Sequence, residues 1–328
     1  MNSIMHGVAD VGRMINEGKA LILAGDEALL KQLPRGNWVG GTTPYFISPE
    51  GGVISRDKIF VTELPDDVQQ VAVQSYDDRD IDRVYADAPA NGFTFLILPA
   101  GSPVHLAFAL KAPQFPDFGM RPLVGWISGV YLPDLGKVSP KTLNGMTGEL
   151  SDRHAVVMRV ELKHDRVCDM GIVNIFKQGD GDVYEVFENT FSAGDVLING
   201  QRANLAEHAV ARKLDTRLPL VADFCGAMIN VSFQSVDEKG RMVNFYAPLL
   251  KGLKYRQAAP CADYVGEFTR QIPKDDGHIV FSCNCILNFI HSELEGKKTG
   301  GIVGPITFGE VAYQLLNQTM VYLTVHKI

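Results

Sequence analysis

The sequence predicts a mixed α/β fold, built from strand–helix–strand units to which β-hairpins are added. Three stretches repeat one pattern: an apolar strand after a glycine, a break of small residues, a helix, and a second strand that carries Val-Gly. They span residues 18–46, 92–131 and 277–310. Apolar runs of strand length beside apolar residues at helical spacing are typical of βαβ structure. The repetition predicts internal pseudo-symmetry; the alternative is the general likeness of all βαβ units.

The last of these stretches is the most informative. Its first strand turns small and polar at residues 282–284, and a helical pattern follows over residues 286–294. Gly296 can end that helix, because glycine tolerates the left-handed conformation that follows many helices. The second strand, residues 301–308, ends beside Glu310. Small polar residues therefore stand where each strand of this unit ends.

The two earlier stretches show matching signals. Ser102 is a good N-cap with Pro103 in the first helical turn, and Asp26 can cap the helix of the first stretch. The Val-Gly pairs lie at residues 39–40, 124–125 and 303–304. Their distances from the opening glycines are unequal, which excludes a solenoid of fixed period.

The remaining segments predict further helices, strands and loops. An amphipathic helix is expected over residues 1–17, a charged helix over 77–91 and a loop over 133–148. Asn204 is expected to cap another helix, with Glu207 at capping-box spacing. Further strands are predicted over residues 58–63, 71–74, 154–161, 167–177, 227–236, 242–247 and 320–325.

Composition narrows the class of protein. The chain has 328 residues, of which 46% are hydrophobic, enough for two domains or one large domain with internal repetition. The formal net charge of −7 argues against nucleic acid or membrane surfaces as partners, because both require a basic face. From the lack of a long apolar run we expect neither a membrane span nor a signal peptide. Five scattered cysteines do not form a disulfide framework and favour a reducing cytoplasm.

Several short motifs resemble FIST domains, which are sensory modules of bacterial signal transduction. The Asn-Gly at residues 199–200, the strand ending in Cys283, and residues 302–310 with the following Asn317 are similar to the C-terminal portion of that family. Residues 123–129 resemble its Gly-x-(Ser/Thr)-x-Gly stretch. The resemblance implies an N-terminal portion over residues 1–198 and a C-terminal portion over residues 199–328.

The resemblance also implies a function. FIST domains bind small ligands such as amino acids and are often coupled to kinases or cyclases, and some relatives bind haem and sense nitric oxide. We therefore expect a ligand-binding sensory protein that recognises amino acids or small carboxylates and acts through a separate signalling kinase or cyclase. The alternatives are a haem-based gas sensor, with His105 as the candidate axial ligand, and an enzyme that uses a cysteine or carboxylate in the same cleft.

The candidate ligand-binding residues stand at strand ends and strand–helix junctions. Backbone N–H groups at such junctions attract anions and lower thiol pKa values, and a carboxylate there could bind a ligand ammonium group. We expect these groups to converge if the three units pack about a common axis. The candidates are Trp38, Thr42, Thr43, Ser128, Cys283, Asn284, Thr307 and Glu310.

Each candidate also has a purely structural interpretation. Cys283 and Cys285 can be core residues, Glu310 a solvated carboxylate, Trp38 a packed aromatic, and His105 a satisfied histidine in a helix. The spacing H-x4-C-x-C-x5-H over residues 278–291 is not a standard zinc pattern, and no nucleophile elbow is present. No cofactor, metal or catalytic residue is predicted.

Overall fold

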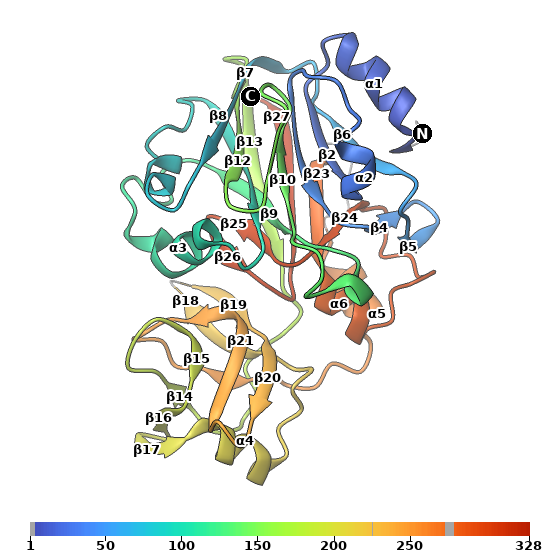
Figure 1. The fold of residues 1–328 in the computed structure, drawn as a ribbon. Helices are drawn as coiled ribbons and strands as arrows, with labels where there is room; N and C mark the ends of the chain where they lie inside the picture. Colours follow the sequence, from blue (N-terminus) through green and yellow to red (C-terminus); the bar gives the residue numbers. More distant parts are fainter. Residues whose placement is uncertain (1–3, 225, 273–278) are drawn as a thin grey trace. The chain divides into compact units, whose positions relative to one another are not determined.

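The computed structural model describes residues 4–224, 226–272 and 279–328. Unit 1 comprises Met1–Val173, Ile272–Leu315 and Met320–Ile328, and unit 2 comprises Asn174–Gln271 and Leu316–Thr319. The predicted mixed α/β class is confirmed, since both strands and helices build the chain (Figure 1). The portions 1–198 and 199–328 remain a prediction of the family resemblance; the compact units divide the chain elsewhere, because unit 2 interrupts unit 1.

Each of three six-stranded sheets in unit 1 contains a parallel pair of strands joined by a helix (Figure 1). The three units are β2 (Leu21–Gly25), α2 (Glu27–Leu30) and β3 (Trp38–Thr42); β8 (Gly92–Pro99), α3 (Pro103–Lys111) and β9 (Leu123–Ser128); and β23 (Ile279–Cys285), α6 (Ile286–His291) and β24 (Gly304–Thr307). Asp26 and Ser102 cap their helices as predicted, accepting hydrogen bonds from the N–H groups of Ala28 and His105. The predicted repetition is therefore confirmed.

The same arrangement of strands flanks each parallel pair. Beside its first strand lie two antiparallel strands: β6 (Ile59–Glu63) and β1 (Met5–His6); β12 (Ala155–Leu162) and β7 (Val68–Tyr76); or β27 (Met320–Lys327) and β13 (Arg166–Val173). Beside its second strand lies an antiparallel hairpin: β10 (Thr142–Asn144) and β11 (Glu149–Ser151); β25 (Glu310–Ala312) and β26 (Gln314–Leu316); or β4 (Tyr45–Ser48) and β5 (Gly51–Ile54). Identical strand order in three sheets establishes a three-fold internal pseudo-symmetry.

The hairpins are exchanged between the repeats. The hairpin that follows β3 in the chain pairs with β24 of the third repeat, the hairpin after β9 pairs with β3 of the first, and the hairpin after β24 pairs with β9 of the second. Each sheet therefore contains strands from two repeats, and the exchange closes into a ring. We conclude that unit 1 is held together by backbone pairing as well as by its apolar core.

The Val-Gly glycines occupy equivalent positions in the three sheets. Gly40 lies beside Leu23 of the neighbouring parallel strand, and Gly125 lies beside Leu96. A Cβ atom at Gly125 or Gly304 would overlap a backbone carbonyl oxygen of the adjacent strand. Glycine is therefore required at these two positions because the neighbouring backbone approaches too closely for any side chain.

Unit 2 is a separate small α/β structure inserted between β13 and β23. It contains three three-stranded sheets. They are β14 (Tyr184–Glu185), β16 (Asp195–Ile198) and β17 (Gln201–Asn204); β15 (Thr190–Ala193), β21 (Met242–Leu249) and β20 (Phe233–Asp237); and β19 (Ala227–Val231), β18 (Leu220–Phe224) and β22 (Arg256–Gln257). Its helices are α4 (Leu205–Arg212) and α5 (Tyr264–Gln271). Asn204 caps α4 as predicted, since its side chain accepts a hydrogen bond from the N–H of Glu207.

Some predicted elements are wrong in extent or type. The charged stretch 77–91 forms only the 3-10 turn η1 (Ile81–Val84), because aspartate side chains there accept hydrogen bonds from nearby N–H groups and compete with a helix. The expected loop 133–148 contains β10, whose partner β3 comes from a distant part of the sequence. The N-terminal helix α1 is shorter than expected (Val8–Asn16), and α6 ends at His291, before Gly296.

Candidate functional site

The predicted small polar residues do converge at the centre of unit 1. Thr43, Ser128 and Thr307 are equivalent, because each lies three residues after a Val-Gly glycine. Ser128 and Thr307 end the second strand of their parallel pairs, and Thr43 directly follows β3. Their side chains are fully buried. The backbone N–H of Gly129 donates a hydrogen bond to the carbonyl oxygen of Thr42 (2.7 Å). The backbone N–H of Phe308 donates one to the carbonyl oxygen of Ile127 (2.9 Å). The three repeats therefore meet at these strand ends, as the repetition predicts.

The third of these contacts has a different donor. Pro44 occupies the position of Gly129 and Phe308 but has no N–H group. The hydroxyl of Thr43 takes over, donating a hydrogen bond of 2.7 Å to the carbonyl oxygen of Ile306. Thr43 thus has a structural role that the sequence alone does not reveal.

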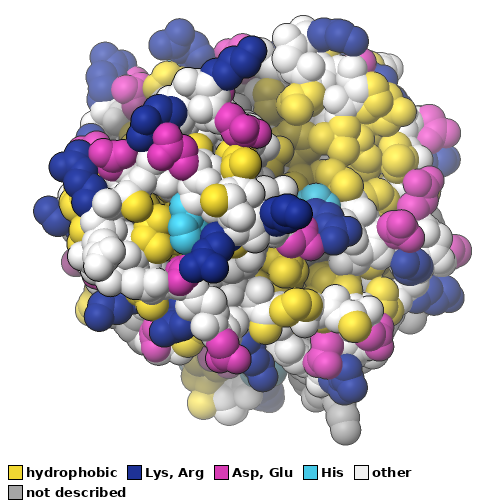
Figure 2. Space-filling view, turned by 90° about the horizontal axis from the view of Figure 1, so that it is seen from below, with side chains coloured by type: hydrophobic (Ala, Val, Ile, Leu, Met, Phe, Trp, Pro, Cys, Tyr) yellow, Lys and Arg dark blue, Asp and Glu magenta, His cyan; other side chains and the backbone are white. Residues whose placement is uncertain are grey.

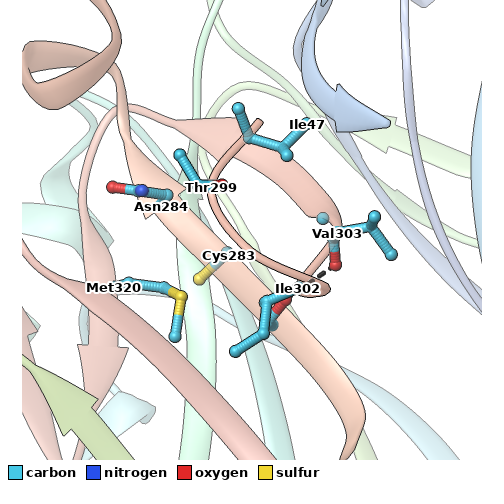
Figure 3. Close-up of a pocket in the computed structure, with 9 residues that line it drawn as sticks. Ile47, Cys283, Asn284, Thr299, Ile302, Val303 and Met320 are labelled. Carbon is cyan, nitrogen blue, oxygen red and sulfur yellow. Dashed lines mark hydrogen bonds between the residues drawn. The ribbon is translucent and has the colours of Figure 1, made fainter. Parts of the chain in front are cut away.

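Cys283 and Asn284 lie beside a very small cavity (Figure 3). Figure 3 shows Met320, Ile302 and Thr299 around it, and its volume is about 10 Å³, which is room for about one water molecule. The side-chain oxygen of Asn284 accepts hydrogen bonds from the backbone N–H of Cys285 (2.7 Å) and from the side-chain amide of Asn288 (2.9 Å). Both predicted residues therefore belong to the interior of the third repeat, and no ligand of amino-acid size fits beside them.

The thiol of Cys283 is chemically quiet in this environment. Burial raises its pKa well above the ordinary value, and the charge of Glu310 raises it further. Its thiol donates a hydrogen bond of 3.5 Å to the carbonyl oxygen of Gly125. Glu310 itself is fully buried on β25, so the alternative interpretation as a solvated carboxylate is wrong. Thr307 donates a hydrogen bond of 3.0 Å to the carbonyl oxygen of Gly309.

We predict that Cys283 and Cys285 resist alkylation in the folded protein. Only the thiolate reacts rapidly, and both burial and a raised pKa suppress it at Cys283. Treatment with N-ethylmaleimide at pH 7 followed by peptide mass spectrometry should leave both cysteines unmodified within an hour. The same treatment in 6 M guanidinium is the control and should label both; rapid native labelling of Cys283 would contradict the assignment.

Trp38 and His105 are also structural. Trp38 is buried in the core of the first repeat, and its indole N–H donates a hydrogen bond of 2.8 Å to the carbonyl oxygen of Pro34. His105 is buried in α3, where its Nδ1 accepts a hydrogen bond of 3.1 Å from the N–H of Gly101. Desolvation lowers the pKa of His105 to about 4. The ring is thus neutral, and its Nδ1 is engaged with the backbone, which favours a structural role.

A cleft of ligand size lies at the carboxyl ends of β2 and β3. Its volume is about 280 Å³, and Thr42 and Thr43 form part of its wall. Opposite them stand the beginning of α2 and the segment that follows β9. The crevice at the carboxyl ends of parallel strands is where open α/β sheets most often bind ligands. Of the eight predicted residues, the structure brings Thr42 and Thr43 to this cleft.

Charged groups of both signs line the cleft. Arg56 donates hydrogen bonds to Asp26 (2.7 Å) and Asp134 (3.2 Å), and its guanidinium lies 5.2 Å from the centre of the Tyr131 ring. The hydrogen bond with Asp26 raises the pKa of Arg56 above its ordinary value, so the group is cationic throughout the physiological range. Lys31 also lines the cleft and, within the described residues, forms no ion pair.

The repeats differ at the residue that follows each of their three equivalent small polar residues. Gly129 lines the cleft, and its N–H donates to the carbonyl oxygen of Thr42. At the equivalent position the other repeats carry Phe308 and Pro44. A Cβ atom at Gly129 would lie 2.2 Å from the Phe308 ring, so a side chain at this position would clash with that ring. The three repeats therefore differ in side-chain size here, which is a departure from exact three-fold symmetry.

Sequence reasoning missed the charged residues of the cleft. Arg56, Asp134 and Tyr131 lie in connections whose partners are far away in the sequence, and only the fold brings them together. Asp26 was recognised solely as a helix cap, although its second carboxylate oxygen binds Arg56. The signal that could have found this site is the general preference of ligands for the carboxyl ends of parallel strands.

Other classes of site have less support. Among the residues that the structure describes, no group of three or more His, Cys, Asp or Glu side chains is placed to hold a metal ion. His278, part of the spacing considered above, lies outside the described residues. Lysines and arginines on the face drawn in Figure 2 are interspersed with acidic side chains. None of the helices in the described ranges is long and apolar enough to cross a membrane.

The fold and the cleft define a three-repeat α/β protein with an insertion and a charged strand-edge crevice. The chain belongs to the family described as "Family of unknown function (DUF6976)", whose profile matches residues 6–326. No curated protein matches the chain.

Proposed function

We propose that the protein binds a small zwitterionic or carboxylate ligand, such as an amino acid, in the cleft of the first repeat. The observation that carries the proposal is the presence of Arg56 and Lys31 together with Glu27 and Asp134 around one space of about 280 Å³. A ligand carboxylate would pair with the cationic side chains and an ammonium group with the carboxylates. The volume lies near the lower end of the range typical of ligand sites, which favours a small molecule.

The position of Arg56 supports this ligand class. Its guanidinium is held between two carboxylates, Asp26 and Asp134, but its side chain is about half exposed. A planar guanidinium can bind a ligand carboxylate through two parallel hydrogen bonds. Because Asp26 precedes α2 and Asp134 follows β9, a ligand bound to Arg56 would contact segments of two repeats.

The biological role that we propose is sensory. It rests on the resemblance of several motifs to FIST domains, in which such ligands are sensed and a kinase or cyclase responds. A separate signalling protein would then read the bound state. Neither catalysis nor haem binding has comparable support, since Cys283 and Glu310 are buried away from the cleft and His105 is engaged with the Gly101 N–H.

Thermal-shift measurements with amino acids and small carboxylates test the proposal. A ligand that binds only the folded protein raises its stability by about 2.7 kcal/mol at a concentration 100 times its Kd. We expect at least one compound to raise the Tm by several degrees in the native protein, and the Arg56→Ala variant to lose most of that shift. Replacement of Arg56 should itself cost only about 0–1 kcal/mol, since exposed ion pairs contribute little to stability.

The matched control is Arg79→Ala. Arg79 belongs to the same unit, pairs with Asp77, and lies outside the cleft. This variant should keep the full ligand-induced shift. A panel in which no amino acid or small carboxylate changes the Tm, or an equal shift in Arg56→Ala and the native protein, would overturn the proposal.

A further inference from the structure

A second cleft of unit 1 shares no residue with the charged one. It lies between β6 of the first sheet and β23 of the third, and its volume is about 440 Å³. That volume is within the range of small-molecule sites. Its apolar lining includes Ile4, Phe60, Val61, Val280, Phe281 and Ile302.

Two polar side chains of this second cleft, those of Ser282 and Glu63, are already engaged. The hydroxyl of Ser282 donates a hydrogen bond of 2.7 Å to the carbonyl oxygen of Val303. Glu63 forms an ion pair of 2.9 Å with Lys19. A ligand with a net charge would find no uncommitted opposite charge on the lining, and its desolvation would be unfavourable. The cleft therefore favours a neutral molecule.

An irregularity in β23 turns one side chain toward this space. The pairing of β23 with β27 shifts in register between Ile279 and Phe281, so Val280 has no partner on β27. Such bulges redirect side chains and often occur beside functional sites. Val280 is partly exposed and lines the cleft. The strand thus departs from regular pairing at the point where it borders the opening.

We propose that the cleft between β6 and β23 binds a neutral, apolar small molecule. The proposal is independent of the ligand assigned to the charged cleft, because a different set of residues carries it. A neutral occupant buries its apolar surface against the lining, and the gain in free energy increases with the apolar area removed from water. A cleft of about 440 Å³ has room for a small molecule.

Fluorescence titration with Nile red, a neutral apolar dye, tests this assignment. We expect saturable binding to the native protein with a blue-shifted emission. Val280→Trp, which places a larger ring at the opening, and Val280→Asp, which introduces a charge there, should each weaken binding at least tenfold. Val167→Trp on β13 is the control, since Val167 is exposed and lies outside the cleft, and it should bind the dye like the native protein.

Circular dichroism and size-exclusion chromatography with light scattering separate the other outcomes. Variants that bind less dye must retain the native spectrum and Tm, and Val280→Asp serves if Val280→Trp does not fold. Dye binding that is equal in all four proteins would refute the site. A native oligomer that dissociates on Val280 substitution would also refute it, by showing a second copy of the chain as the occupant. The Arg56→Ala variant, which should lose the thermal shift caused by amino acids, should bind Nile red like the native protein.

Discussion

A Gly125→Val variant is expected not to fold. Gly125 lies on β9 against β8, and a Cβ atom there would overlap the carbonyl oxygen of Leu96. The obstacle is backbone, which cannot move aside without breaking the parallel pairing at the centre of the sheet. We expect a loss of more than about 4 kcal/mol, a large share of the 5–15 kcal/mol that stabilises a typical domain. Circular dichroism and urea titration would show no cooperative transition of native amplitude.

Substitutions at two other glycines serve as comparisons for Gly125→Val. At Gly40, the equivalent position in the first repeat, the nearest backbone atom would lie 3.5 Å from an added Cβ, so Gly40→Ala should be much milder. Gly12 lies inside α1, with its nearest neighbour at 3.7 Å, so Gly12→Ala should be neutral or stabilise by about 0.5–1 kcal/mol. A Gly125→Val protein with native stability would refute the close approach of β8 and β9.

The stability of the protein should fall below pH 6.5 because of His105. Burial lowers the pKa of this histidine to about 4, against an ordinary value of 6.5. Between these values the unfolded chain binds a proton that the folded protein excludes, so unfolding becomes easier as the pH falls. The full difference is about 3 kcal/mol and is reached near pH 4. Above pH 6.5 the group is neutral in both states and its contribution no longer changes.

A comparison with His105→Gln isolates this effect. Glutamine keeps an acceptor that can receive the Gly101 N–H but does not titrate. Over the range from pH 8 down to pH 4, the urea midpoint of the native protein should fall relative to that of His105→Gln, because only the native protein loses stability through residue 105. Carboxylates titrate in both proteins and cancel in the difference. Parallel curves over the whole range would show that His105 is not buried in the neutral form.

The repeat architecture could be predicted because its signals are local. A glycine is needed wherever two strands approach too closely for a side chain, so Gly125 and Gly304 mark equivalent places in the sequence. Helix caps such as Ser102 depend on neighbours two or three residues away and were likewise predicted. The convergence of Thr43, Ser128 and Thr307 follows from the repetition once the units share an axis.

The hairpin exchange and the charged cleft could not be predicted in the same way. Pairing of β4 with β24 joins residues about 260 positions apart, and no local pattern records such a partner. Arg56 reads as an ordinary solvated arginine until Asp134 is brought to it by the fold. Burial also argues against Cys283 and Glu310 as ligand-binding residues. The sequence shows that they lie near strand ends, but it does not show which residues pack over them.

The ring of exchanged hairpins has a consequence for how the protein folds. The first sheet lacks β10 until the second repeat is synthesised, and the third repeat needs β4 from the start of the chain. No repeat can complete its own sheet, so early intermediates would expose unpaired strand edges, which are prone to aggregate. Contacts this distant in sequence also slow folding, since a long loop must close before they form. Once closed, the ring has no terminal repeat at which unravelling can begin.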